Sequence, residues 1–342
     1  MNKLIIIGNG FDLAHGLPTR YEDFILWEIN KAFSNKKEIN EIDSLFFSIK
    51  ANFDLSNIMY FNSVVDFQSF IEKSKNSINI KYKLPFFQFL FIRIVNKRWV
   101  DIERDYFDKL NEEIDARIHG KVKELNLALD KIKILFKEYL IEIFKGVIAQ
   151  NSIETIFRND FFSDKQINIQ FLNFNYTPTL NYYIEENVSY NININYIHGE
   201  IRNENNPIIF GYGDESDDNY YKLEKTNVNE YLRHMKSFAY LQTPNYRNLF
   251  NFLDSGNFDV YILGHSCGLS DRLLFTHILE HSNFHTLKIY YHQKSELEND
   301  FFEKTQNLSR YFQLNSKHKM RTKVVPFNES KPLVPFKPKQ TN

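Results

Sequence analysis

Three features are scarce or absent in this sequence of 342 residues, and each shortage excludes a class of protein. The one cysteine, Cys267, excludes a disulfide framework and any zinc cluster built from cysteines. The strongest apolar stretch, residues 84–95, contains Gln88 and Arg93 and is too short to span a bilayer. Neither sign of charge dominates, since Lys and Arg number 42 and Asp and Glu number 43, which argues against nucleic acid bound through overall basicity.

The N-terminus shows no targeting signal. Only four consecutive apolar residues precede Gly8, too few for the core of a signal peptide. Hydrophobic residues make up 43% of the chain and charged residues 25%, which is normal for a folded globular protein. We therefore expect a cytoplasmic protein without a membrane partner.

Runs rich in β-branched residues recur along the chain and predict buried strands. They lie at residues 3–7, 167–175, 192–198, 207–211, 258–264, 286–292 and 320–327. Helix-length segments at 269–282 and 295–313 separate the later runs. Strands that alternate with helices predict an α/β fold with a doubly wound, mostly parallel sheet, in which ligands bind at the carboxyl ends of the strands.

Residues 22–160 differ from the rest because they lack such runs. Apolar residues from Val122 to Tyr139 recur every three or four positions, as on an amphipathic helix, and Gly120 leaves open one long helix or a helical hairpin. We therefore predict a large helical insertion at 22–160. The predicted nucleotide-binding α/β domain consists of residues 1–21 and 161–330, and the proline-containing residues 331–342 form an extended tail.

Four loops at predicted strand ends carry groups suited to chemistry. In the first, a Gly-x-Gly turn at residues 8–10 can bring backbone N–H groups close to a phosphate, although a plain tight turn explains it equally well. Asp12 suits either a ribose hydroxyl or a helix cap, and residues 16–18 (Gly-Leu-Pro) add a second turn that folds back over a ligand.

The other three loops follow later strands. Asn175, in the Asn-Phe-Asn-Tyr-Thr segment 173–177, can project its amide into the sheet-end crevice, while Thr177 suits a helix cap before Pro178. His198 precedes Gly199 and suits proton transfer near neutral pH, though a lone histidine is usually structural. Residues 264–268 (Gly-His-Ser-Cys-Gly) are small enough for a nucleotide to approach and also satisfy the G-x-S-x-G pattern of serine hydrolases.

Taken together, these segments resemble the AbiH family of bacteriophage abortive-infection proteins. The resemblance rests on GNGFDLAHGLPTRYEDF, FLNFNYTPTL, IHGE, IIFGYGDE, LQTPNYR and GHSCGLSD in this order, and it includes residues 99–103 of the helical insertion. It implies a role in defence against phage, with a phage-derived trigger as an expected partner and a homo-oligomer left open.

The same loops also resemble, more distantly, sirtuin-like NAD-binding domains, whose first loop has the form G-A-G-x-S-x-x-x-G-I-P. Gly8, Gly10, Gly16 and Pro18 match that form, whereas Asp12 replaces its Ser. The family's T-x-N-x-D segment is matched by Asn175, with Thr177 in place of the Asp; its catalytic His-Gly is matched by His198, and its later G-x-S by residues 264–266. A single cysteine excludes the four-cysteine zinc module of the deacetylases.

This second resemblance implies an enzyme that hydrolyses NAD to ADP-ribose and nicotinamide, with NAD as substrate and no metal. Asn175 would orient the water or the ribose hydroxyls and His198 would be the general base. The first loop is expected to contact the nucleotide through its N–H groups, and the last loop is expected to contact the adenine ribose. The residues of these contacts are Gly8, Asn9, Gly10, Phe11, Asp12, Gly16, Pro18, Gly264, Ser266 and Asp271.

Three alternatives stand beside this hypothesis. The first is a catalytically silent module that senses NAD or a related nucleotide and triggers abortive infection through a protein partner. The second is a serine hydrolase that uses Ser266 with a downstream histidine. The third is a metal nuclease built from Asp12, Asp214, Glu215 and histidines, which no ligand spacing supports.

Overall fold

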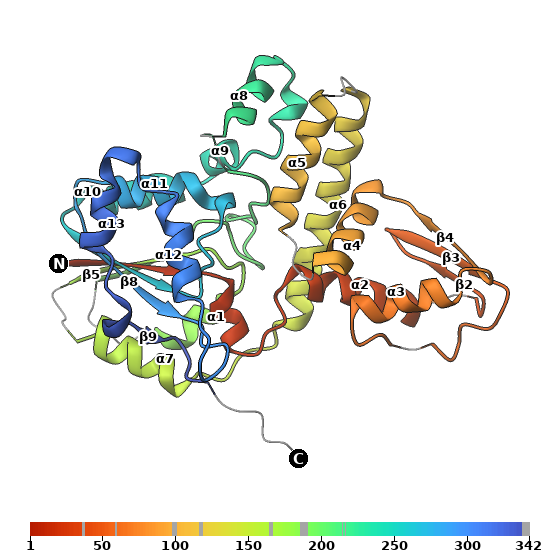
Figure 1. Cartoon of the computed structure of the whole chain (residues 1–342), viewed down its shortest axis with the longest axis horizontal. Coiled ribbons are helices and arrows are strands. Elements are labelled where there is room, and N and C mark those ends of the chain that lie inside the picture. Colours follow the sequence, from red (N-terminus) through yellow and green to blue (C-terminus); the bar gives the residue numbers. More distant parts are fainter. Residues whose placement is uncertain are drawn as a thin grey trace. The chain divides into compact units, whose positions relative to one another are not determined.

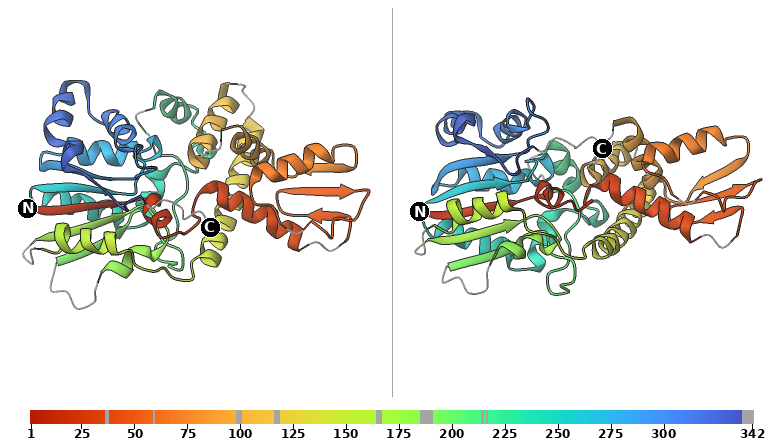
Figure 2. Two further views of the ribbon diagram at one scale, coloured as in Figure 1. Left: turned by 60° about the horizontal axis from the view of Figure 1, so that its bottom comes forward. Right: turned by 90° about the horizontal axis from the view of Figure 1, so that it is seen from below.

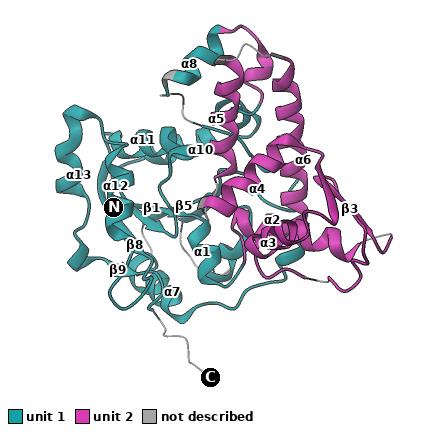
Figure 3. Cartoon of the chain, turned by 45° about the vertical axis from the view of Figure 1, so that its right-hand side comes forward, with its two compact units in different colours: residues 1–17, 140–225, 234–342 teal, residues 18–139, 226–233 magenta. Residues whose placement is uncertain are grey.

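The chain forms two compact units, each described here by itself (Figure 3). The computed structural model describes residues 1–35, 38–58, 60–97, 101–115, 119–163, 167–184, 191–213, 215 and 217–336. Unit 1 comprises residues 1–17, 140–225 and 234–342, and unit 2 comprises residues 18–139 and 226–233. These bounds differ from the predicted insertion at 22–160, because Ile153 and Ile156 pack in the core of unit 1.

Unit 1 is built on a six-stranded sheet in which every neighbouring pair of strands is parallel (Figure 1). The strands stand in the order β6 (Asn191–Tyr196), β5 (Asn168–Asn173), β1 (Asn2–Ile7), β7 (Phe258–Leu263), β8 (Phe284–Tyr291) and β9 (Lys331–Pro332). Numbered along the chain within this sheet, that order is 3-2-1-4-5-6, as in doubly wound dinucleotide-binding sheets. The predicted α/β fold with a parallel sheet is confirmed, and its order reverses between β1 and β7.

Strand β1 shows why the sheet is covered on both faces. Leu4 and Ile6 enter one hydrophobic core and Ile5 and Ile7 enter the other, because successive side chains of a strand point to opposite faces. Helices α10 (Asn245–Asp254), α11 (Arg272–Glu280) and α12 (Phe301–Ser309) supply the first core, and α1 (Asn9–Ala14) and α7 (Asn151–Ile156) supply the second. Figure 2 shows the blue C-terminal helices and the light green α7 on opposite sides of the sheet.

Shorter helices complete unit 1. They are η1 (Phe157–Phe161, a π-helix), η2 (Pro178–Tyr183), α8 (Asp218–Lys225), α9 (Lys236–Ala239), η4 (Tyr240–Gln242), η5 (Leu269–Asp271), η6 (Leu314–Ser316), α13 (Lys317–Lys323) and η7 (Phe327–Glu329). Among the described residues of both units, no helix combines the length and the apolar character that crossing a bilayer requires.

Unit 2 contains helices and a small antiparallel sheet. Its elements are α2 (Tyr21–Ser34), β2 (Glu41–Asp43), β3 (Phe47–Ala51), α3 (Val64–Lys73), β4 (Ile78–Tyr82), α4 (Pro85–Lys97), α5 (Ile102–Asp115), most of α6 (His119–Ile143) and η3 (Asn229–Tyr231). The sheet β2-β3-β4 was not predicted. In β3, buried Phe47, Ile49 and Ala51 alternate with Ser48 and Lys50, which is the pattern of a half-buried strand and not the continuous apolar run that we took as the strand signal.

The helical periodicity of residues 122–139 is confirmed by α6, and α5 and α6 are separate helices. Gly120 lies inside α6 and does not end it. Asp101 precedes α5, where its Oδ1 accepts hydrogen bonds from the N–H groups of Glu103 and Arg104 at 3.1 Å, as an N-cap does. Trp99 and Val100 lie outside the described residues.

Two predicted strands are wrong, and the predicted tail begins too early. Residues 207–211 form an extended loop, because their backbone pairs with the His198 turn: Ile209 N–H donates to the His198 carbonyl at 2.7 Å. Residues 320–323, half of the run 320–327, belong to α13, whose last turn carries basic side chains that suit a helix C-terminus. Val324 forms an isolated parallel bridge with Leu287. The last strand is instead β9, at the start of the predicted tail 331–342, where an edge position tolerates Pro332; residues 337–342 lie outside the described chain.

The loops that follow β1 and β7 touch backbone to backbone. Gly10 N–H donates to the Gly264 carbonyl at 2.7 Å. Gly264 has a φ of +71°, and a Cβ atom there would lie 2.1 Å from the Phe11 nitrogen. A Cβ on Gly8 would lie 2.5 Å from the His265 Cα. Glycine is therefore required at these positions for packing between the two central strand ends.

We expect Gly264→Ala to lower the free energy of unfolding by at least about 3 kcal/mol, because no rotamer relieves a backbone clash. Gly16→Ala is the matched control, since Gly16 also has a positive φ (+77°) but its Cβ would meet nothing within 4 Å. That substitution should cost only the left-handed strain, about 1–2 kcal/mol. Urea unfolding of both variants measures the difference, and equal losses would contradict the packing argument.

Candidate functional site

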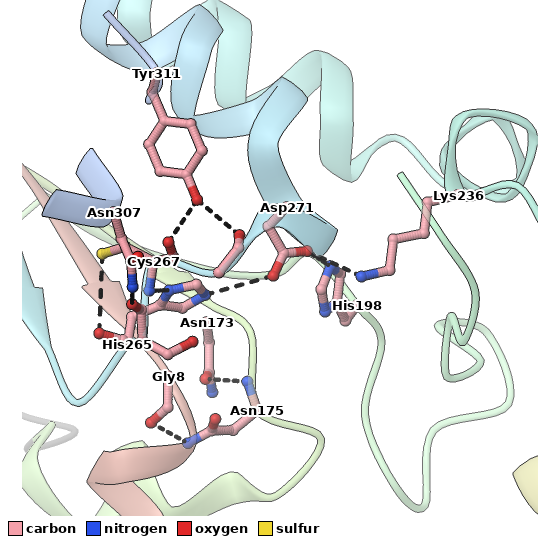
Figure 4. A network of polar contacts seen from close by, with 12 residues as sticks. Gly8, Asn173, Asn175, His198, Lys236, His265, Cys267, Asp271, Asn307 and Tyr311 are labelled. Carbon is pink, nitrogen blue, oxygen red and sulfur yellow. Dashed lines mark hydrogen bonds and ion pairs between the residues drawn. The ribbon is translucent and has the colours of Figure 1, made fainter. Parts of the chain in front are cut away.

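Polar side chains from four loops gather at the carboxyl edge of the parallel sheet of unit 1 (Figure 4). The loops follow β1, β5, β6 and β7, on either side of the point where the strand order reverses. Phe174 links them, because its ring packs edge-on against His198 and His265 at centroid distances of 4.9 and 4.5 Å. This edge is where open α/β sheets bind ligands.

His198 is buried and contacts a carboxylate. Its Nε2 lies 3.2 Å from Asp271 Oδ1 and 3.1 Å from the Tyr240 hydroxyl. Burial and the positive charge of Lys236 lower the pKa of His198, while Asp271 acts in the opposite direction. The imidazole is therefore neutral at pH 7, the state in which a histidine can accept a proton.

Nitrogen atoms lie near both carboxylate oxygens of Asp271. Lys236 Nζ lies 2.9 Å from Oδ1, and the Lys236 side chain is itself fully buried. His265 Nε2 lies 3.7 Å from Oδ2. Burial by itself would raise the pKa of Asp271, but Lys236 foremost, and then the two histidines, hold that pKa well below its usual range. Asp271 is thus a buried carboxylate that stays ionised.

His265 is held in one orientation by the loop that carries it. Its Nδ1 accepts a hydrogen bond from the Cys267 N–H at 3.0 Å. Burial lowers the pKa of His265 to about 4 against the influence of Asp271. This ring is neutral, and with Nδ1 as the acceptor its proton lies on Nε2, facing Asp271.

Lys236 reaches Asp271 because two distant segments pair. Tyr212 forms a parallel bridge with Met235, and Lys236 N–H donates to the Tyr212 carbonyl at 2.8 Å. Gly211 permits this approach, since a Cβ there would lie 2.1 Å from the His234 carbonyl oxygen. Asp214, a few residues on, lies outside the described residues.

Asn175 lies beside the first loop. Its Nδ2 donates to the Gly8 carbonyl at 3.1 Å, and its N–H donates to Asn173 Oδ1 at 2.9 Å. Among the described residues, none bonds Asn175 Oδ1. The Asn173 Nδ2 atom is buried and has no partner in the described part of the chain.

Asp12 faces Thr177 across the ends of β1 and β5. Its Oδ2 accepts a hydrogen bond from the Thr177 hydroxyl at 2.5 Å, and Thr177 in turn lies 3.1 Å from the Thr179 hydroxyl. Asp12 Oδ1 is buried without a partner among the described residues. Burial raises the pKa of Asp12 to about 6, because these hydroxyls offset only part of the desolvation cost.

The other residues predicted to bind the nucleotide differ in burial and in contacts. Phe11 is fully buried in the core with Phe157 and Tyr183. Gly16 and Pro18 are exposed turn residues, and Ser266 is exposed while Asn9 is exposed at the start of α1. Asp271 contacts His198 and Lys236, so its side chain is engaged in the cluster and not turned toward a separate ribose subsite.

Three N–H groups of the first loop are unavailable for the predicted phosphate cradle. The N–H groups of Gly8, Gly10 and Phe11 donate to the carbonyls of Leu263, Gly264 and Gly8. These amides are already satisfied, and α1, with six residues, is too short to act as a strong dipole. The Gly-x-Gly pattern here serves the contact with Gly264.

The loop after β7 does not form a serine nucleophile site. The left-handed residue is Cys267 (φ +55°) and not Ser266, and among the described histidines none bonds the Ser266 hydroxyl. Burial raises the pKa of the Cys267 thiol to about 12, so it stays protonated.

In the described part of the chain, no group of three or more His, Cys, Asp or Glu is placed to hold a metal ion.

Sequence reasoning missed three residues of the cluster: Lys236, Tyr240 and His265. His265 occupies the variable position of the G-x-S pattern at residues 264–266, and a variable position carries no functional signal. Lys236 and Tyr240 precede the LQTPNYR segment and had no signal of their own, because a lysine or tyrosine in a polar stretch usually lies on the surface.

We expect Asp12→Asn to stabilise the protein at pH 7.5 by about 2–3 kcal/mol, because the folded protein then no longer buries a charge. The folded pKa of about 6 exceeds the ordinary 3.8, so the destabilisation by Asp12 develops as pH rises through that interval and is absent below it. Denaturant unfolding at pH 3.5 and 7.5 should show the gain only at the higher pH. Asp66→Asn, at an exposed carboxylate, is the control; a gain that does not depend on pH would contradict the argument.

Comparison with known proteins identifies the family. A family model described as "Bacteriophage abortive infection AbiH" matches residues 4–293, which include all four loops of the site. No curated protein and no solved structure matches the chain. With most of its length covered by that match, the chain belongs to the AbiH family of bacteriophage abortive infection proteins.

Proposed function

We propose that this AbiH protein acts in abortive infection by hydrolysing NAD to ADP-ribose and nicotinamide. The observation that carries the proposal is the neutral, buried His198 held against the ionised Asp271 at the carboxyl edge of a sheet with the 3-2-1-4-5-6 order. Such an edge suits a dinucleotide, and a neutral histidine there suits removal of a proton from water.

The polar groups around Asn175 support a sugar as the bound group. Asp12 Oδ1 and Asn173 Nδ2 are buried without partners among the described residues, and a ribose hydroxyl both donates and accepts hydrogen bonds. The sirtuin-like pattern has a Ser at the position of Asp12 and an Asp at the position of Thr177. This chain therefore has the carboxylate and the hydroxyl the other way round, and the two side chains touch. The exchange therefore keeps one hydroxyl–carboxylate pair at this place.

In the proposed reaction, a water oxygen bonds to the anomeric carbon of the nicotinamide ribose while the bond to the nicotinamide nitrogen breaks. That electron pair neutralises the pyridinium, so the leaving group needs no proton. Asn175 orients the water or the ribose hydroxyls, and His198 takes the proton that the water loses. A phage-derived trigger would start the reaction.

A second candidate is a module that binds a nucleotide without converting it. It is favoured by the occupied N–H groups of Gly8, Gly10 and Phe11, which are unavailable for the expected phosphate cradle. Such a module would signal through a protein partner. Binding of NAD without release of nicotinamide would distinguish it from the hydrolase.

Cellular NAD after phage infection tests the proposal. Wild type should deplete NAD, whereas His198→Ala and Asn175→Ala should each slow depletion on the order of 100-fold or more, since each removes a group at the reacting ribose. Mass spectrometry of NAD, ADP-ribose and nicotinamide gives the measurement.

The matched controls are His285→Ala and Asn191→Ala. His285 pairs with Asp259 at 2.8 Å but is exposed, and the exposed Asn191 side chain donates to Asn168, so both substitutions remove the same residue types away from the site. They should leave NAD depletion unchanged. Full phage resistance with steady NAD in wild type would refute the hydrolase and favour the binding module.

A further inference from the structure

Asp271 is surrounded by nitrogen atoms of three side chains. Its Oδ1 faces His198 Nε2 at 3.2 Å and Lys236 Nζ at 2.9 Å, and its Oδ2 faces His265 Nε2 at 3.7 Å. We infer that Asp271, held by Lys236, is a positioning residue that fixes the tautomer of His198 and leaves Nδ1 as the atom that accepts a proton. The chemical part of this inference rests on the proposed hydrolysis; the tautomer does not.

The tautomer follows from what a carboxylate can do. An ionised carboxylate only accepts hydrogen bonds, so the His198 Nε2 that faces it must carry the proton. In a neutral imidazole the other nitrogen, Nδ1, then has a free lone pair. No described residue bonds Nδ1, and Figure 4 shows this atom turned away from Asp271. His198 therefore presents its basic nitrogen on the side opposite the carboxylate.

Lys236 neutralises the negative charge of the buried Asp271. Without Lys236, the buried carboxylate would favour a proton on itself or on His198, so the His198–Asp271 pair would stay protonated up to a higher pH. With Lys236 at 2.9 Å, Asp271 stays ionised, and the pair is neutral overall. When His198 takes a proton from water, the imidazolium that forms lies against a carboxylate, which stabilises it.

The groups that face His198 come from several elements. They are Lys236 of α9, Tyr240 of η4, Asp271 of η5, His265 after β7 and the Tyr176 ring after β5. Of these, Lys236 lowers the pKa of His198 and Asp271 raises it. Removing Lys236 therefore raises the pKa of His198, and the acid limb of the pH–rate profile moves to higher pH.

His265 provides an internal reference. Its tautomer is set by the Cys267 backbone N–H, which bonds Nδ1 at 3.0 Å and is independent of the Asp271 side chain. Changing Asp271 and Lys236 together should thus alter the tautomer of His198 and leave that of His265 as it is.

The test is a long-range 1H–15N spectrum of histidine-labelled protein, with His198 and His265 assigned through His198→Gln and His265→Gln. In wild type both rings should be neutral with the proton on Nε2. In the double variant Asp271→Asn with Lys236→Met, no ammonium holds the amide oxygen at the Oδ1 position, so the amide can donate to His198 Nε2. His198 should then move its proton to Nδ1, while His265 does not change. NAD turnover should fall on the order of 100-fold or more in kcat, with KM little affected.

Two further variants guard against a folding defect and separate the roles. Asp271→Asn alone keeps the Lys236 ammonium beside the Oδ1 position, which holds the amide oxygen there and should leave His198 protonated on Nε2. This single variant is therefore the control for loss of the negative charge, whereas the double variant also restores charge balance. Lys236→Met alone should keep the tautomer and shift the acid limb of kcat to higher pH. A merely structural lysine would not move that limb.

The outcomes separate this inference from the proposed function. If His198 keeps its proton on Nε2 in the double variant, the positioning role is refuted whatever the activity. If the tautomer reverses as expected but wild type releases no nicotinamide from NAD when the phage trigger is supplied by infection, NAD hydrolysis is refuted and the positioning role stands.

Discussion

The backbone contact between Gly10 and Gly264 is the constraint on which the rest of the site depends. It joins the ends of β1 and β7, the two strands between which the sheet order reverses. A side chain on Gly8, Gly10 or Gly264 would separate these ends, since each Cβ would lie under 3 Å from backbone atoms. Because Gly8 abuts His265, the same contact fixes where the second loop places its polar groups.

From that contact the polar cluster follows in steps. His265 lies against Gly8, Asp271 lies within reach of His265, and Asp271 then meets His198 and Lys236. The carbonyls of the loop accept hydrogen bonds from α12 and from Tyr311, two residues beyond it. Lys304 donates to the carbonyl of His265, Asn307 to that of Ser266, and Tyr311 to those of Cys267 and Gly268. The loop is thus held by hydrogen bonds on one face and presents the side chains of His265 and Asp271 on the other.

A buried charge at this edge of the sheet costs free energy of folding, and Asp271 and Asp12 differ in how far their partners offset that cost. Asp271 and Lys236 neutralise one another, which keeps both ionised in a dry environment. Asp12 has only uncharged partners, the hydroxyls of Thr177 and Thr179 and the Asn175 amide, so burial raises its pKa to about 6 and its charged form destabilises the fold at neutral pH. An apolar or amide side chain would serve stability better there. A carboxylate at that position therefore points to function.

The sequence alone predicted more of the fold than of the candidate site. The strand run at residues 3–7, the turn glycines and the helix-length spacing of the later segments determined a doubly wound parallel sheet, because continuous apolar runs and glycine turns are local properties. The short alternating strands of unit 2 were missed because half-buried strands give a weaker local signal. The sequence also marked His198 and Asn175 as strand-end polar groups, but not their partners. Only the tertiary structure decided that Asp271 and Lys236 meet His198 and that the Gly-x-Gly amides are already bonded, since both depend on contacts between residues far apart in the chain, which no local pattern records.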